Sequence, residues 1–178
     1  MNGNMDINGE RHAITVEISD TQSHLRVGSE FLTMLVRNVL VSEAVKRASI
    51  SLALVDDATI QDVNRRHLGH DQPTDVISFG LSEPGDEELI GAVVVSAEMA
   101  ASIAAETAGV DPFAELALYV VHGLLHLCGY GDKSQKEVDA IRRREAEIMA
   151  LAGLPHTYPL TRLATAGDAG LESAQWLV

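Results

Sequence analysis

Apolar residues recur along the chain with two periods, and these periods predict four strands and five helices. Alternation of apolar and polar residues, or a short unbroken apolar run, is typical of a strand, whereas recurrence every three to four residues is typical of a helix. The predicted strands cover residues 12–19, 48–55, 75–80 and 89–96. Residues 89–96 are almost all apolar, so we expect this strand near the centre of the sheet.

Helix boundaries follow from residues that typically cap helices. The expected helices cover residues 27–45, 57–68, 97–108, 112–128 and a last segment that begins after 134. Asp56, Ser96 and Asp111 stand where a side chain can accept a hydrogen bond from the first turn. Ser134 and Glu137 form a capping box for the last helix. The fourth helix is apolar almost all round, so we expect it to be buried.

The order of these elements predicts an α+β fold, a small mixed four-stranded sheet with helices packed on it. The chain has 178 residues, of which 46% are hydrophobic, and this suits one globular domain. We expect that domain to cover residues 1–158. After Pro159 the pattern dissolves into small and polar residues, so 159–178 are interpreted as a flexible C-terminal tail.

Composition and charge narrow the possible functions. No apolar run approaches the roughly 20 residues of a membrane span, and the polar, acidic first residues do not resemble a secretory signal. Cys128 is the single cysteine, which excludes an internal disulfide, so we expect a cytoplasmic protein without membrane contact. The net charge of −13 argues mildly against a nucleic-acid partner, although a local basic patch can outweigh it.

Residues 122–132, HGLLHLCGYGD, carry the clearest chemistry. His122 and His126 are four residues apart on the predicted buried helix, so their imidazoles share one face and can reach one metal ion. Gly129 can turn the chain and bring Asp132 back toward the pair. Two histidines and a carboxylate form a normal zinc set with an open fourth position. We therefore predict one Zn²⁺ bound by His122, His126 and Asp132, a zincin-like site at the end of a buried helix. The alternative is a hydrogen-bonded pair of core histidines.

Gly123 stands where zinc peptidases with a similar motif carry a glutamate. That glutamate moves protons during peptide hydrolysis, which glycine cannot do. A phosphodiester has a better leaving group than a peptide, and a metal ion lowers the pKa of its bound water to about 7. The absent glutamate therefore favours phosphoryl chemistry over proteolysis. We also expect Gly123 to leave room beside the metal for a bulky substrate.

The motif and two further blocks resemble one protein family. HGLLHLCGY, residues 122–130, resembles the H-G-x-L-H-L-x-G-Y-D-H signature of the YbeY family of metal-dependent endoribonucleases. Residues 63–79, VNRRHLGHDQPTDVISF, are similar to that family's N-x-x-x-R-x-x-D-x-P-T-D-V-L-S-F segment, and AEIMALAGL, 146–154, is similar to its E-I-M close. The resemblance runs from about residue 12 to about 159.

This resemblance implies a zinc-dependent, single-strand-specific endoribonuclease of the bacterial cytoplasm. Its partners would be ribosomal RNA and the small ribosomal subunit, and its role would be maturation of the 3′ end of the small-subunit RNA and ribosome quality control. His122 would serve both as a metal ligand and as a catalytic residue. The implied fold, a small sheet covered by helices, agrees with the fold expected from the residue pattern.

The chain departs from the family pattern at the third ligand. The family has histidine where this chain has Asp132, or, in a second alignment, Gly131 is inserted and Lys133 replaces that histidine. Lysine is a poor metal ligand at neutral pH, so Asp132 is the expected ligand in either alignment. Ala92 replaces an aspartate that the family often carries after the residue matched by Gly91.

A second departure removes a candidate phosphate-binding arginine. Leu68 occupies its position, and Arg66 is assigned the catalytic role in its place, with Arg65 and His70 as nearby substrate-binding candidates. The alternative for all three is a solvated helix surface. Thr74 and Asp75 match the family's Thr-Asp pair. Asp75 either fixes a turn before a strand or orders the loop beside the metal.

Three functional hypotheses remain open at this point. The first is an endoribonuclease whose nucleophile is either metal-activated water or the RNA 2′-hydroxyl. The second is a metalloprotease or another hydrolase, for which the absent glutamate is the main difficulty. The third is a non-catalytic ribosome-assembly factor in which the metal only stabilises the fold, an interpretation that Leu68 and the acidic charge favour.

Overall fold

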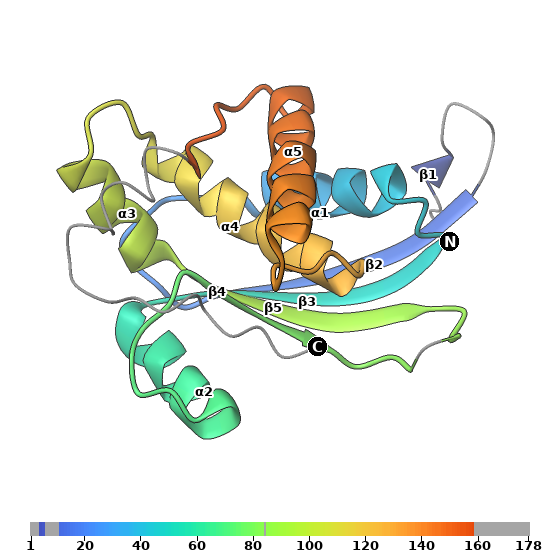
Figure 1. The fold of residues 1–178 in the computed structure, drawn as a ribbon, viewed down its shortest axis with the longest axis horizontal. Coiled ribbons are helices and arrows are strands. Elements are labelled where there is room, and N and C mark those ends of the chain that lie inside the picture. The colour runs from blue at the N-terminus through green and yellow to red at the C-terminus, as the bar shows by residue number, and fades with distance from the viewer. Residues whose placement is uncertain (1–3, 6–10, 84, 159–178) are drawn as a thin grey trace.

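The computed structural model of the protein describes residues 4–5, 11–83 and 85–158. Within them the chain forms five strands and five helices, labelled in Figure 1. The elements are β1 (Asn4–Met5), β2 (Arg11–Asp20), α1 (Ser29–Ser42), β3 (Arg47–Val55), α2 (Asp57–Leu68), β4 (Val76–Gly80), β5 (Leu89–Ser96), α3 (Ala97–Glu106), α4 (Pro112–Leu127) and α5 (Gln135–Leu151). The predicted tail, 159–178, lies outside the described residues.

The sheet has the strand order β1-β2-β3-β5-β4. Strands β2, β3 and β5 are parallel, whereas β4 is antiparallel to β5. The predicted α+β fold with four main strands in a mixed sheet is therefore confirmed, and β5 lies inside the sheet as its apolar sequence indicates. The two-residue β1, antiparallel to β2, is an addition that is too short to produce a recognisable sequence pattern.

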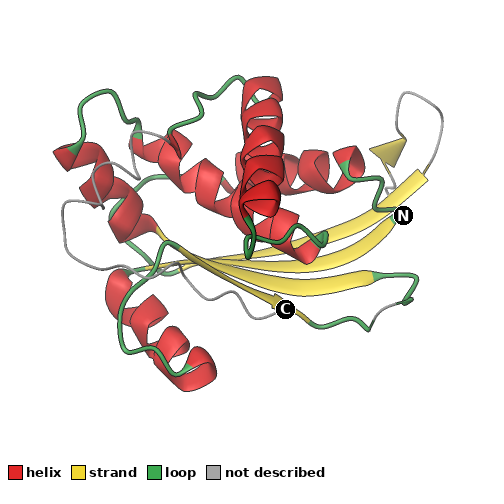
Figure 2. Ribbon diagram, in the orientation of Figure 1, coloured by secondary structure: helices red, strands yellow, loops and turns green. Residues whose placement is uncertain are grey.

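The helices cover the sheet unequally. Helices α1, α3, α4 and α5 lie on one face, and α2 lies on the other (Figures 1 and 2). Helix α4 runs through the middle of the thicker layer, in contact with α1, α3, α5, β4 and β5. Every residue from 114 to 126 is buried, which confirms the prediction from its sequence. None of the helices in the described ranges is long and apolar enough to cross a membrane.

Local capping fixes where the helices begin. The side chains of Asp56, Ser96 and Asp111 accept backbone hydrogen bonds at 2.8, 3.0 and 2.9 Å from the first turns of α2, α3 and α4. The predicted capping box between Ser134 and Glu137 is present at the start of α5. These starts set the register of α4 and α5, and hence which side chains the two helices direct at each other.

Candidate metal centre

Two histidines from the last turns of α4 meet in the interior. His122 and His126 are 4% and 7% exposed, and their Nε2 atoms lie 3.0 Å apart. Two nitrogen ligands on one tetrahedral zinc ion would lie about 3.3 Å apart, given Zn–N distances of about 2.0–2.1 Å. The predicted convergence of the two rings is therefore confirmed, at a separation close to what a shared ion requires.

The hydrogen-bond partners of the Nδ1 atoms determine whether each Nε2 atom carries a proton or a lone pair. His126 Nδ1 lies 2.8 Å from the main-chain oxygen of Tyr130, and His122 Nδ1 lies 2.5 Å from Oε1 of Glu145. A carbonyl and a carboxylate accept hydrogen bonds, so both Nδ1 atoms carry the proton. The lone pairs of the two Nε2 atoms then face each other, which is stable only with a proton or a cation between them. The donor set therefore fits a metal ion.

Electrostatics favour the neutral form of His126. Burial, reinforced by the neighbouring charge of His122, lowers the pKa of His126 to about 4. A proton shared between the rings is therefore disfavoured at neutral pH. Burial alone would raise the pKa of Glu145, but hydrogen bonds from His122 and His156 and the charges of His122 and Arg142 hold it well below its usual value. Glu145 thus remains an anion beside the pair.

Glu145 is a site residue that the sequence pattern did not reveal. Its carboxylate is fully buried and accepts hydrogen bonds at 2.9 and 2.8 Å from Arg142 Nη1. His156 Nε2 lies 3.3 Å from its Oε2. A signal was available, because Glu145 falls between Ile141 and Ile148 on the apolar stripe of α5. A charged residue on a buried stripe needs partners, and these are Arg142, His156 and His122.

The loop after α4 holds the second histidine. Gly129 adopts a left-handed conformation, with φ 95°, and turns the chain as its position predicts. The hydroxyl of Tyr130 donates to Glu43 Oε2 at 3.1 Å, and Arg144 Nε donates to Glu43 Oε1 at 2.6 Å. The carbonyl that accepts the proton of His126 therefore belongs to a residue that is bonded to the C-cap of α1 and, through Glu43, connected to α5.

Asp132, the third predicted ligand, is half-buried beyond this turn. Burial raises the pKa of its carboxyl group, and the charge of His122 acts in the opposite direction. Within the described part of the chain, no group of three or more His, Cys, Asp or Glu side chains is arranged to hold a metal. The structure thus brings two of the three predicted ligands together, and Asp132 as a ligand stays a prediction.

Gly123 faces the sheet. A Cβ atom on this residue would lie 2.7 Å from Val93 Cγ1, 2.8 Å from Ser78 Oγ and 2.9 Å from Val76 Cγ2. Ser78 Oγ also donates a hydrogen bond to the carbonyl of Gly123 at 3.0 Å. The expectation that Gly123 leaves room for substrate beside the metal is therefore wrong, because β4 and β5 occupy that space. The glycine lets α4 approach the sheet closely.

The predicted RNA-binding residues on α2 lie on the other side of the sheet from α4 (Figure 1). Arg65 and Arg66 are exposed and pair with Asp62 at 2.6 and 2.8 Å. Leu68 packs into the small apolar cluster under β4 and β5, and His70 is half-exposed in the loop after the helix. None of these described contacts joins the arginines to the histidine pair, so their roles stay predictions.

Thr74 and Asp75 stabilise the start of β4. The Thr74 hydroxyl donates to Asp75 Oδ1 at 2.9 Å, and the same oxygen accepts the main-chain N–H of Val76 at 3.0 Å. The main-chain oxygen of Asp75 accepts the N–H of Ser96 at 2.9 Å. These contacts agree with the structural interpretation of Asp75, while the proposed ordering of a loop beside the metal stays a prediction.

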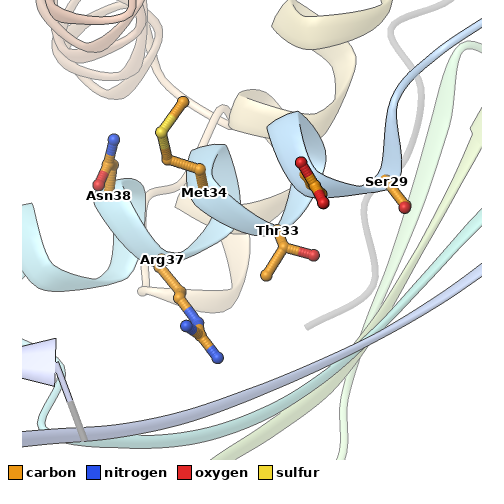
Figure 3. A pocket seen from close by; sticks show the side chains of 6 residues that line it. Ser29, Thr33, Met34, Arg37 and Asn38 are labelled. Atoms are coloured by element: carbon orange, nitrogen blue, oxygen red, sulfur yellow. The ribbon is translucent and has the colours of Figure 1, made fainter. Parts of the chain in front are cut away.

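A separate hollow lies along α1 and is unrelated to this chemistry. Its volume is about 340 Å³, and Figure 3 shows side chains that line it. The lining residues are Ser29, Glu30, Thr33, Met34, Arg37 and Asn38. None of the predicted site residues is among them, so the histidine pair remains the better candidate for a functional site.

Known proteins resemble this chain over most of its length. A solution structure of TM1509 from Thermotoga maritima superposes with a TM-score of 0.53 at 23% identity, over 90% of this chain and 99% of that one, and supports the fold. A protein named Endoribonuclease YbeY from Carboxydothermus hydrogenoformans is 37% identical over 140 residues, 78% of this chain and 97% of its own. The relative of the same name from Syntrophotalea carbinolica is 38% identical over 141 residues, 76% of this chain and 93% of its own. The family model described as Endoribonuclease YbeY matches residues 15–153, and the chain belongs to that family.

Proposed function

We propose that this chain is a zinc-dependent endoribonuclease that cleaves single-stranded ribosomal RNA. The observation that carries the proposal is the pair of buried Nε2 atoms, 3.0 Å apart, with both Nδ1 atoms committed to acceptors. Family membership supports the nuclease assignment, because the relatives are named endoribonucleases. Imidazole nitrogens together with a carboxylate are donors that suit zinc.

His122, His126 and Asp132 are the residues that would hold the ion. When bound, zinc supplies a Lewis acid that stabilises the charge developing on a phosphodiester. The chain's own contribution is to hold each of the two imidazoles in a fixed orientation inside an apolar layer. His122 is held from α5 and His126 from the loop after α4. Phosphoryl transfer depends chiefly on such positioning and charge stabilisation.

The direction of Gly123 argues against the peptidase alternative. The residue after the first histidine faces the sheet, so α4 presents no carboxylate beside the pair from that position. Peptide hydrolysis needs a group that delivers a proton to the leaving amine. A phosphodiester leaving group depends less on that proton, so the described site is better suited to RNA than to a peptide.

The biological substrate follows from the resemblance to the family. We propose the 3′ end of small-subunit ribosomal RNA as the target, within ribosome quality control in the cytoplasm and in contact with the small ribosomal subunit. Because the net charge is −13, attraction to RNA must come from local groups. Lys133, which follows Asp132, and Lys136, in the first turn of α5, are exposed and would supply positive charge at the predicted ligand loop.

One observation favours a non-catalytic alternative. Leu68, which replaces the arginine of the family pattern, is packed into the apolar cluster beneath β4 and β5 and cannot bind phosphate. A ribosome-assembly factor with a structural metal would tolerate this replacement. It predicts ribosome association that survives His122→Ala, with no RNA cleavage by the wild type.

Metal analysis and RNA cleavage with matched histidine variants test the proposal. Wild-type protein should contain about one zinc per chain and cleave a precursor RNA with an unpaired 3′ extension. His126→Ala should lose the metal and at least about 100-fold in cleavage rate, because a catalytic metal contributes several kcal/mol to transition-state stabilisation. His67→Ala, an exposed histidine on α2, is the control and should behave as wild type.

Cleavage products also decide the nucleophile. A 2′,3′-cyclic phosphate end would indicate attack by the RNA 2′-hydroxyl, whereas its absence from the first product formed would indicate attack by water. A zinc-loaded wild-type protein that leaves the single-stranded extension intact would overturn the nuclease proposal, and retained ribosome binding would then support the assembly factor.

A further inference from the structure

We infer that Glu145 is a positioning residue, which holds His122 in the tautomer and orientation that direct Nε2 toward His126. The contact comes from a different helix, 23 residues further along the chain. Its importance for cleavage rests on the proposed nuclease function, but its geometry is independent of any substrate. Glu145 therefore extends the candidate site from α4 to α5.

The contacts of Glu145 define this role. Oε1 accepts the Nδ1–H of His122 at 2.5 Å, on the flank of the imidazole away from Nε2. A group bound at Nδ1 cannot share an ion with the Nε2 atom of the same ring. The carboxylate is also fully buried, so it cannot contact RNA. Glu145 therefore acts through His122 and not on the metal or the substrate.

The carboxylate is itself held rigidly. Arg142 Nη1 donates to both of its oxygens, and its guanidinium lies 3.7 Å from the centre of the Tyr158 ring. His156 Nε2 lies 3.3 Å from Oε2. A buried carboxylate is stable only when it is paired and hydrogen-bonded in this way. Three contacts from α5 and the segment after it thus fix the acceptor, and the acceptor fixes the imidazole ring.

As a consequence, His122 offers only one of its ring nitrogens, Nε2, as a metal ligand. A neutral imidazole exchanges between two tautomers, and only the form with its proton on Nδ1 offers Nε2 as a ligand. A carboxylate can only accept, so Glu145 selects that form. His126 is selected in the same way by the neutral carbonyl of Tyr130, which is part of the main chain and cannot be removed by substitution. Of the two acceptors, Glu145 is thus the one that mutagenesis can remove.

Two substitutions change the charge and the length of the Glu145 side chain separately. Glu145→Gln keeps the length of the side chain but removes the charge and adds a donor, whereas Glu145→Asp keeps the charge but shortens the reach. The matched control is Glu147→Gln, on the same helix, where the glutamate is about half-exposed and pairs with Arg144. Thermal unfolding of each variant checks that it is folded before it is compared.

The first measurement is the imidazole ¹⁵N spectrum of metal-free protein, which distinguishes the two tautomers without RNA. Wild type and Glu147→Gln should show His122 with its proton on Nδ1, and both Glu145 variants should show a mixture. Zinc affinity, measured by competition with a chelator, should fall about 10- to 100-fold in both variants. On single-stranded RNA at saturating zinc, kcat should fall while KM stays unchanged, because Glu145 does not touch the substrate.

Wild-type protein with the His122 proton on Nε2 would overturn the inference, whatever the folding of the variants. Unchanged zinc affinity in folded Glu145→Gln and Glu145→Asp would also overturn it. Failure of the nuclease proposal gives a different result, since RNA would stay intact while the tautomer and zinc measurements still respond to Glu145.

Discussion

At the residue scale, Gly123 sets how closely α4 approaches the sheet. The atoms that a Cβ would meet belong to Val76, Ser78 and Val93, on β4 and β5. The hydrogen bond from Ser78 to the carbonyl of Gly123 crosses the same interface. Because the histidine pair lies on this helix, the helix-to-sheet distance also determines where the two imidazoles sit relative to the loop that follows.

Gly123→Ala should therefore destabilise the fold by about 1–3 kcal/mol, the usual cost of overpacking a well-packed interior. The added methyl would lie under 3.0 Å from three side-chain atoms, so α4 or the strands must shift. Denaturant unfolding measures the effect. Gly80→Ala is the control, because nothing lies within 4 Å of its Cβ position. Equal stability of the two variants would contradict the close packing.

The sequence was enough to predict the histidine pair but not the role of Gly123. Spacing of four residues on a helix brings His122 and His126 together whatever surrounds them, so their convergence is predictable from local geometry. The constraint on Gly123 comes from strands about 30 to 47 residues earlier, and no local pattern reports it. The motif alone predicted open space where the sheet lies.

At the element scale, α5 positions both imidazoles. Glu145 bonds directly to His122, and the adjacent Arg144 bonds to Glu43, which accepts the hydroxyl of Tyr130. The main-chain oxygen of Tyr130 then accepts the proton of His126. The helix boundaries were predictable because capping is local, whereas these pairings depend on how α1, α4 and α5 pack and were not predicted.

Tyr130→Phe tests the second of these connections. The change removes the donor to Glu43 and should lower the free energy of unfolding by about 1 kcal/mol, the typical net value of a hydrogen bond. Zinc affinity should fall less than tenfold, because the carbonyl that bonds to His126 remains. Denaturant unfolding and chelator competition measure the two effects. A loss of affinity as large as that of Glu145→Gln would show that the loop is held mainly by this hydroxyl.

At the scale of the whole molecule, the segment after α5 returns to the central helix. Thr157 Oγ1 donates to Oε2 of the fully buried Glu115 at 2.5 Å, and His156 contacts Glu145. Burial raises the pKa of Glu115 above its ordinary value.

This raised pKa predicts a specific dependence of stability on pH. Above the ordinary pKa of 4.5 the folded state retains a proton that the unfolded state releases, so stability from Glu115 is lost as pH rises through the folded pKa. Glu115→Gln removes this titration. The difference in unfolding free energy, variant minus wild type, should therefore increase as the pH rises above about 4.5.

Unfolding curves at a series of pH values from about 4.5 upward measure the difference, and Glu106→Gln, at an exposed position of α3, is the control for the loss of a glutamate side-chain charge. A pH-independent difference for Glu115→Gln would show that Glu115 is ionised in the fold as readily as in the unfolded chain.

The close contact between α4 and the sheet also bears on attempts to redesign the catalyst. Installing the general base of a zinc peptidase at residue 123 would drive a carboxylate into the packed layer formed by Val76, Ser78 and Val93. A single substitution at residue 123 therefore cannot convert this scaffold into a peptidase. Directed evolution toward peptide substrates would first have to remodel β4 and β5, or recruit a base from outside α4.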